Sequence, residues 1–137
     1  MKKPHLEVAI GLIIEDGKAL VARRRAHVHA GGCWEFPGGK RQPGESYEAC
    51  LLRELREELG IEAEITAPWV RIDYEYPEHT VTMQGFRCRI VRGEPKALAS
   101  EKIQWTPLTD LKPDEFPPAN RSSVEQLRCT GHRAVVH

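Results

Sequence analysis

Three glutamates at helical spacing are the residues of this sequence best suited to chemistry. Glu54, Glu57 and Glu58 are spaced i, i+3 and i+4, so on a helix their carboxylates share one small patch. Like charges at this spacing repel by roughly 0.2–0.5 kcal/mol per pair, which favours a cation that neutralises the patch. Oxygen ligands without histidine or thiolate suit Mg²⁺, with Mn²⁺ as an alternative, and Mg²⁺ usually shares its coordination with substrate phosphates. The pattern therefore indicates a metal site for phosphate cleavage.

The same run of charges also has a purely structural interpretation. A string such as Arg-Glu-Leu-Arg-Glu-Glu-Leu is common on solvated helix faces, and by itself it favours such a face. Its neighbours shift the balance toward chemistry. The backbone of Gly38 and Gly39 can approach a metal or a phosphate closely, and Glu45 adds a fourth carboxylate at the entrance of the helix.

A helix over 46–60 must position these acids. Ser46 can cap its first turn, and Gly60 is a natural terminator. Leu51, Leu55 and Leu59 recur every four residues and form one apolar stripe, which is expected to face the core. The acids then lie on a different face of the same helix.

The rest of the chain predicts short strands and one closing helix. The strands are expected at 6–14 and 19–22 around a turn at Asp16-Gly17, at 34–36, at 69–76 and 80–90 around a turn at Pro77-Glu78, and at 103–106. The closing helix is expected at 122–128, followed by a loose tail at 130–137. These elements predict an α/β fold, a mixed sheet with flanking helices, as a single domain over 1–137.

Composition argues against several classes of partner. Lys+Arg and Asp+Glu both number 20, so no global field favours nucleic acid or an anionic membrane, and 23–25 is the only dense basic cluster. No apolar run reaches the ~18 residues that a membrane helix needs. The four cysteines show no CxxC spacing, which fits a reducing compartment, so the expected location is cytoplasmic.

With these elements in place, the site resembles the signature of the Nudix hydrolases. That signature is a glycine, five residues, a glutamate, seven residues, and then Arg-Glu-aliphatic-any-Glu-Glu-any-Gly-aliphatic. Gly39, Glu45 and the run from Arg53 to Ile61 match every fixed position. The resemblance implies an α/β/α sandwich and a divalent-metal-dependent hydrolase of nucleotide-like phosphate chains.

The resemblance also implies roles for the matching residues. Glu54, Glu57 and Glu58 are expected to hold the metal, aided by the Gly38 carbonyl, and Arg53 to orient these acids by ion pairing. The other matches are Glu45, expected to support the site by pairing with Arg53, and Glu101, expected to be a further, late metal ligand. For the base that positions the attacking water, Glu54 is the first candidate, and Glu45 and Glu101 are its rivals.

Over most of the chain the resemblance is closest to the MutT branch, whose members hydrolyse 8-oxo-dGTP at the β-phosphorus and release pyrophosphate. The stretches that carry it are 1–3 with the following strand and Arg24, 34–40, and 114–120. Asn120 is expected to read the edge of the base, the alternative being that it caps the last helix. Arg24 is expected to border the base. Phe36 supplies apolar contact unless it is simply core.

The residues expected at the phosphates and at the turn between strands 69–76 and 80–90 resemble the MutT branch less closely. Gly39 and Lys40 are expected to contact phosphates, although an exposed lysine is often only solvated. Glu78-His79 replaces an Asp-Arg pair of the branch, so Glu78 is expected near the base with altered contacts. One alternative function stays within the family, an enzyme for CTP or another modified nucleotide. The other is a non-catalytic nucleotide sensor, and monomer and homodimer both stay open.

Overall fold

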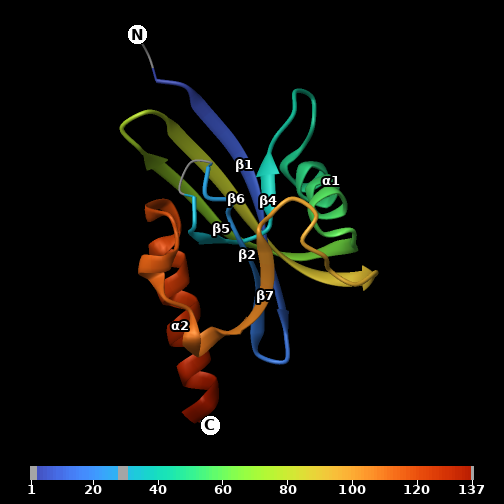
Figure 1. The fold of residues 1–137 in the computed structure, drawn as a ribbon, viewed down its shortest axis with the longest axis vertical. Coiled ribbons are helices and arrows are strands. Elements are labelled where there is room, and N and C mark those ends of the chain that lie inside the picture. The colour runs from blue at the N-terminus through green and yellow to red at the C-terminus, as the bar shows by residue number, and fades with distance from the viewer. Residues whose placement is uncertain (1–2, 28–30, 137) are drawn as a thin grey trace.

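The structure, a computed structural model that describes residues 3–27 and 31–136, places a mixed sheet between two helices (Figure 1). The strands of the described chain are β1 (His5–Glu15), β2 (Lys18–Arg23), β3 (Trp34–Glu35), β4 (Gly38–Lys40), β5 (Glu62–Glu75), β6 (Thr80–Arg92) and β7 (Lys102–Pro107). The helices are α1 (Tyr47–Leu59) and α2 (Arg121–Val136), with short 3-10 turns η1 (Leu108–Asp110), η2 (Pro113–Glu115) and η3 (Pro118–Asn120).

The strand order is β3-β2-β1-β6-β5, with β4 added to β1 and β7 added to β2. Only the β1–β6 pair is parallel among these, which makes the sheet mixed as predicted. β1 and β2 form the expected hairpin, and Asp16 and Gly17 both adopt positive φ at its turn, at 52° and 74°.

Both faces of β1 are buried, one under each helix. Ala9 and Ile13 belong to the core cluster that contains α1, whereas Ile10 and Leu12 belong to the cluster that contains Val124 and other residues of α2. Successive strand residues point to opposite faces, so this alternation places the two helices on opposite sides of the sheet. The α/β class and the flanking helices expected from the sequence are therefore confirmed.

Helix α1 matches its predicted boundaries. The Ser46 Oγ accepts from the Ala49 N–H over 3.0 Å, and Gly60 ends the helix in the left-handed conformation with φ 70°. Leu51, Leu55 and Leu59 are buried with Cys50 against the sheet. The apolar stripe thus faces the core and leaves the acidic face turned away from it.

Three elements differ from the expectations. Residues 38–40, predicted as a loop, form β4, and β5 begins at Glu62 instead of Trp69, with register shifts on either side of Pro68. Helix α2 begins at Arg121 and continues to Val136, so residues 130–136 are helical where a loose tail was predicted. Gly131 explains part of this, because its lack of a side chain lets the helix approach Leu108 closely. Residues 1–2 of the N-terminal stretch and residue 137 of the tail lie outside the described residues.

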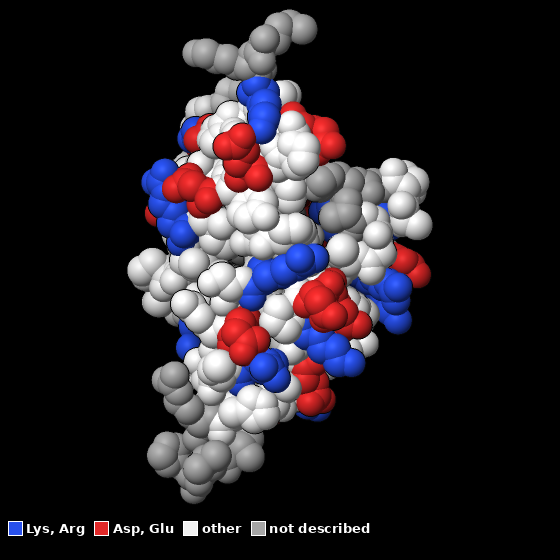
Figure 2. Space-filling model, turned by 90° about the vertical axis from the view of Figure 1, so that its left-hand side faces the viewer, with Lys and Arg blue, Asp and Glu red and all other residues white. Residues whose placement is uncertain are grey.

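On the face shown in Figure 2, acidic and basic side chains are interspersed, in line with the equal numbers of the two in the sequence. Within the described residues, no helix is long and apolar enough to cross a membrane.

Candidate functional site

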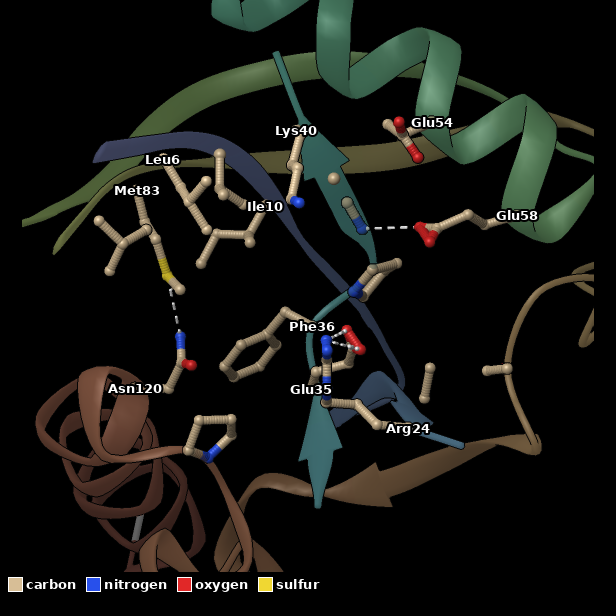
Figure 3. A pocket seen from close by; sticks show the side chains of 18 of the residues that line it. Leu6, Ile10, Arg24, Glu35, Phe36, Lys40, Glu54, Glu58, Met83 and Asn120 are labelled. Atoms are coloured by element: carbon tan, nitrogen blue, oxygen red, sulfur yellow. Dashed lines mark hydrogen bonds and ion pairs between the residues drawn. The ribbon is translucent and has the colours of Figure 1, made fainter. Parts of the chain in front are cut away.

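One large cavity brings most of the predicted site residues together. It has a volume of about 960 Å³ and extends from the acidic face of α1 to the start of α2 (Figure 3). Nine predicted residues line it: Arg24, Phe36, Gly38, Gly39, Lys40, Glu54, Glu58, Glu78 and Asn120. The other four, Arg53, Glu45, Glu57 and Glu101, lie outside the lining.

Close packing of β4 against β1 positions the glycine loop at the cavity. A Cβ at Gly38 would lie 2.0 Å from the Ala9 carbonyl oxygen, so only glycine fits this approach. A Cβ at Gly39 would lie 2.4 Å from the carboxyl carbon of Glu54. The bare Cα of Gly39 is therefore the surface against which the Glu54 carboxylate rests.

Arg53, which does not line the cavity, binds three carboxylates. Its Nε and Nη2 donate to the two oxygens of Glu45 over 2.7 and 2.9 Å, and its Nη1 donates to Glu54 over 2.9 Å and Glu57 over 3.1 Å. The ion pair expected between Arg53 and Glu45 is thus present. Hydrogen bonding from Arg53 lowers the pKa of Glu45 to about 2, and hydrogen bonding to Glu45 raises the pKa of Arg53.

Glu58 is an acid held in the wall of the cavity. The Gly38 N–H donates to its Oε1 over 3.1 Å. Burial raises the pKa of Glu58 to about 8 against the effect of this hydrogen bond, and the charge of Glu54 raises it further. Among the described residues Glu58 forms no salt bridge, and the charge of Arg24 only partly offsets the rise in its pKa.

The three expected metal ligands do not form a finished site. Glu54 and Glu58 line the same cavity, whereas the Glu57 side chain is 59% exposed and contacts Arg53. Within the described ranges, no three aspartate, glutamate, histidine or cysteine side chains lie close enough together to hold a metal ion. Coordination by all three glutamates therefore requires Glu57 to rotate toward the other two.

Glu101 is placed apart from these acids. It is exposed, it does not line the cavity, and its backbone N–H donates to the Arg23 carbonyl beside β7 over 3.0 Å. A role at the metal would need movement of its side chain or of the segment before β7.

At the opposite end of the cavity lies the Asn120 side chain, only 4% exposed. Its Nδ2 donates to the Met83 Sδ over 3.5 Å, and Figure 3 shows the amide turned toward the cavity and Met83. A cap would need a backbone N–H of the first turn of α2 to donate to the Asn120 Oδ1, and no such bond is found among the described residues. The thioether is a weak acceptor, so the amide keeps most of its hydrogen-bonding capacity for a ligand.

The middle of the cavity combines an ion pair with an aromatic wall. Arg24 Nη1 donates to both carboxylate oxygens of Glu35, each over 3.0 Å. Burial raises the pKa of Glu35, while the charge of Arg24 opposes this shift. Phe36 lines the cavity but is only 2% exposed, packed edge-on to Trp69 and beside Phe116, so it is also core.

Lys40 and Glu78 lie at separate parts of the lining. Lys40 ends β4 on the acidic side, and Figure 3 shows its amino group directed into the cavity. Glu78 lies in the turn between β5 and β6, at the other side. Both residues line the cavity, and their contacts to phosphate and base stay predictions.

The lining residues that were not predicted as site residues include Glu35, Tyr76 and Met83. An acid between Trp34 and Phe36 was a usable signal for Glu35, because burial of an acid requires a partner. Tyr76 and Met83 lay within apolar strand patterns and had no such signal. Only pairing of the strands brings them to the cavity.

Comparison with known proteins identifies the family of the chain. Residues 9–126 match the family described as NUDIX domain. The chain is 35% identical over 129 residues to the 8-oxo-dGTP diphosphatase of Escherichia coli K12, covering 93% of this chain and 98% of that protein. It is 53% identical over 60 residues to the CTP pyrophosphohydrolase of the same organism, which covers 44% of each chain.

A solved structure supports the fold. A MutT NUDIX hydrolase from Burkholderia pseudomallei superposes with a TM-score of 0.80 at 27% identity, over 90% of this chain and 98% of that one. The α/β/α sandwich expected from the sequence is thereby confirmed.

Proposed function

The chain belongs to the Nudix hydrolase family, and we propose that it is a Mg²⁺-dependent nucleoside triphosphate diphosphatase whose substrate is 8-oxo-dGTP. The products are the nucleoside monophosphate and pyrophosphate. The observation that carries the proposal is the polarity of the cavity, with carboxylates at one end and a buried asparagine amide at the other. Carboxylates can hold the divalent metal that binds a triphosphate, and an amide can bind a purine base, so the two environments suit the two ends of one substrate.

Nudix hydrolases generally depend on a divalent metal, and the proposed ligands here are Glu54, Glu57 and Glu58 with the Gly38 carbonyl. Their oxygen chemistry fits Mg²⁺ or Mn²⁺. Two features support this: the half-buried Glu58 carboxyl forms no salt bridge among the described residues, and the missing side chain of Gly39 leaves space for the Glu54 carboxylate. Such an ion supplies neutralisation of the phosphate charge when bound.

We assign orientation of the attacking water to Glu54. Of its rivals, Glu45 has both carboxylate oxygens engaged by Arg53, and Glu101 is exposed outside the cavity. Glu54 lines the cavity and accepts a hydrogen bond from Arg53 through one carboxylate oxygen only. Arg53 therefore holds the general base, Glu54, in place. In-line attack of water on the β-phosphorus breaks its bond to the oxygen of the α-phosphate, so the nucleoside monophosphate leaves and the pyrophosphate carries the oxygen of the water.

Recognition of the base is assigned to Asn120, because an amide offers a donor and an acceptor together. Replacement of the weak Met83 contact by two hydrogen bonds to an oxidised purine edge favours binding. Phe36 and Arg24 border this region, Glu78 closes it from the strand turn, and Lys40 is assigned to the phosphates with the Gly39 backbone.

A steady-state comparison of nucleotides tests the proposal. Purified protein with Mg²⁺ should show a kcat/KM for 8-oxo-dGTP at least about 10²-fold above those for dGTP and CTP. Equal values for 8-oxo-dGTP and dGTP would refute the substrate and leave the family assignment intact.

CTP is the second candidate substrate. The 53% identity to a CTP pyrophosphohydrolase over 60 residues favours it, although the match covers less than half of each chain. A kcat/KM for CTP above that for 8-oxo-dGTP in the same panel would establish this alternative.

A further inference from the structure

A hydrogen bond joins the β5–β6 hairpin to the turn that carries Asn120. The Ala119 N–H donates to the Tyr76 hydroxyl oxygen over 3.1 Å, and this contact is buried. Ala119 immediately precedes Asn120 in η3, and Tyr76 itself is 8% exposed. The Tyr76 hydroxyl therefore binds the backbone of the residue immediately before Asn120, whose side-chain amide is assigned to the nucleobase.

The local sequence explains why this N–H needs a partner from elsewhere. Pro117 and Pro118 have no N–H, so Ala119 carries the first backbone donor of the turn. Donors at the start of a helical segment have no acceptor within it, and a buried unpaired donor is costly. The next donor, the Asn120 N–H, is satisfied locally by the Pro117 carbonyl over 2.9 Å. The Tyr76 hydroxyl supplies the acceptor for Ala119.

Tyr76 is itself held on several sides. Its N–H donates to the His79 carbonyl over 2.8 Å, and its carbonyl accepts from the Lys3 amino group over 3.1 Å. Its ring lies 4.8 Å from the Tyr74 ring and 4.9 Å from the His79 ring, measured between centroids. A fixed ring of this kind can define the position of the turn that it contacts.

The Asn120 side chain, by contrast, is weakly held by its own contact. Its donor bond is to the Met83 sulfur, which is a poor acceptor. The direction of the amide therefore depends on the backbone of η3, and that backbone is tied to Tyr76.

We propose that Tyr76 is a positioning residue for nucleobase selection, acting through the Ala119 backbone to fix the Asn120 amide. The inference rests on the proposed role of Asn120 in the proposed function. Tyr76 would thus be a second determinant of nucleobase selection. It lies in the β5–β6 hairpin, away from the η3 turn that carries Asn120, and it acts through its hydroxyl group.

A double-mutant cycle tests this on the full chain. Binding of 8-oxo-dGMP, dGMP and CMP is measured calorimetrically without metal for the wild type, Tyr76→Phe, Asn120→Ala and the double variant. Tyr76→Phe is expected to weaken binding of the preferred nucleotide by about tenfold or more, and to have no further effect once Asn120 is alanine. The same loss in both backgrounds, or no loss in either, would overturn the proposal.

Tyr74→Phe is the matched control, because it removes a hydroxyl from the same hairpin at a side chain that is 38% exposed. It should bind nucleotides as the wild type does. The wild-type panel separately tests the proposed function: tightest binding of dGMP or CMP refutes 8-oxo-dGTP as substrate, and the cycle run with that nucleotide still decides the role of Tyr76.

Amide hydrogen exchange gives a readout independent of binding. In Tyr76→Phe the Ala119 N–H should exchange faster, while the Val124 N–H within α2 keeps its wild-type protection. Unchanged exchange at Ala119 would show that the hydroxyl does not hold the turn. Faster exchange throughout α2 would assign Tyr76 a general structural role and would equally overturn the proposal.

Discussion

Arg53 and Glu45 form a two-point ion pair at the base of the acidic face, with 2.7 Å between Nε and Oε2 and 2.9 Å between Nη2 and Oε1. Their side chains are 17% and 14% exposed. The remaining Arg53 nitrogen, Nη1, reaches Glu54 and Glu57. One guanidinium thus links the helix entrance to two acids of the proposed metal site.

Because of this ion pair, the folded state should lose stability as the solution becomes acidic. Arg53 lowers the pKa of Glu45 to about 2 in the folded state, below its ordinary value of 4.5. The stabilisation is therefore fully present above about pH 4.5 and is lost as the pH falls toward 2. Glu45→Gln should unfold with a weaker pH dependence across this window, measured by urea denaturation. Parallel pH profiles for the two proteins would contradict the pairing.

The acids of α1 should be needed for turnover and dispensable for folding. Glu54→Gln and Glu57→Gln are each expected to lower kcat by about 10²–10⁴-fold, because they remove charge assigned to the water and the metal. Glu48→Gln, on the exposed first turn of the same helix, is the control and should retain wild-type kcat. Near-normal turnover of either test variant with Mg²⁺ would exclude its assigned role.

Gly39→Ala should act through Glu54. The added methyl group would lie 2.4 Å from the Glu54 carboxyl carbon, so the end of a flexible side chain must move. We expect little change in melting temperature and a loss in kcat of about 10²-fold, since small displacements of catalytic groups are costly. The loss should be smaller in a Glu54→Gln background; full additivity would indicate that the glycine acts elsewhere.

Asn120→Ala should reduce selectivity more than turnover. Removal of the amide is expected to lower the ratio of kcat/KM for 8-oxo-dGTP over dGTP by about 10²-fold, and to leave kcat for dGTP within a few fold. Met83→Leu removes the sulfur that the amide contacts while keeping an apolar side chain of similar size, and it should preserve the ratio. An unchanged ratio in Asn120→Ala would transfer base recognition to another residue.

Local patterns predicted the parts of the site that local forces form. The caps of α1, its leucine stripe and the grouping of its glutamates depend on spacings of three and four residues, which a sequence displays directly. The same holds for the β1–β2 hairpin, where Asp16-Gly17 specifies the turn. Residue spacing therefore predicted the grouping of the acids at one end of the cavity, whereas their interpretation as a site also needed the neighbouring glycines, Glu45 and the family resemblance.

Contacts between distant segments could not be located in this way. β4 has only three residues and exists because its backbone pairs with 8–10 of β1. The burial of Glu35 beside Arg24, and the contacts of Tyr76 and Met83 with the Asn120 turn, depend on strand pairing across the sheet. The orientation of Glu57 toward Arg53 is likewise a choice of rotamer that spacing does not determine.

Metal-dependent product release tests the central claim most directly. The rate of pyrophosphate formation from 8-oxo-dGTP is measured in excess chelator and then as Mg²⁺ is added back. We predict no release above background in chelator, restoration by Mg²⁺, and one pyrophosphate for each nucleoside monophosphate. Full activity in chelator, or inorganic phosphate as the first product, would contradict the account.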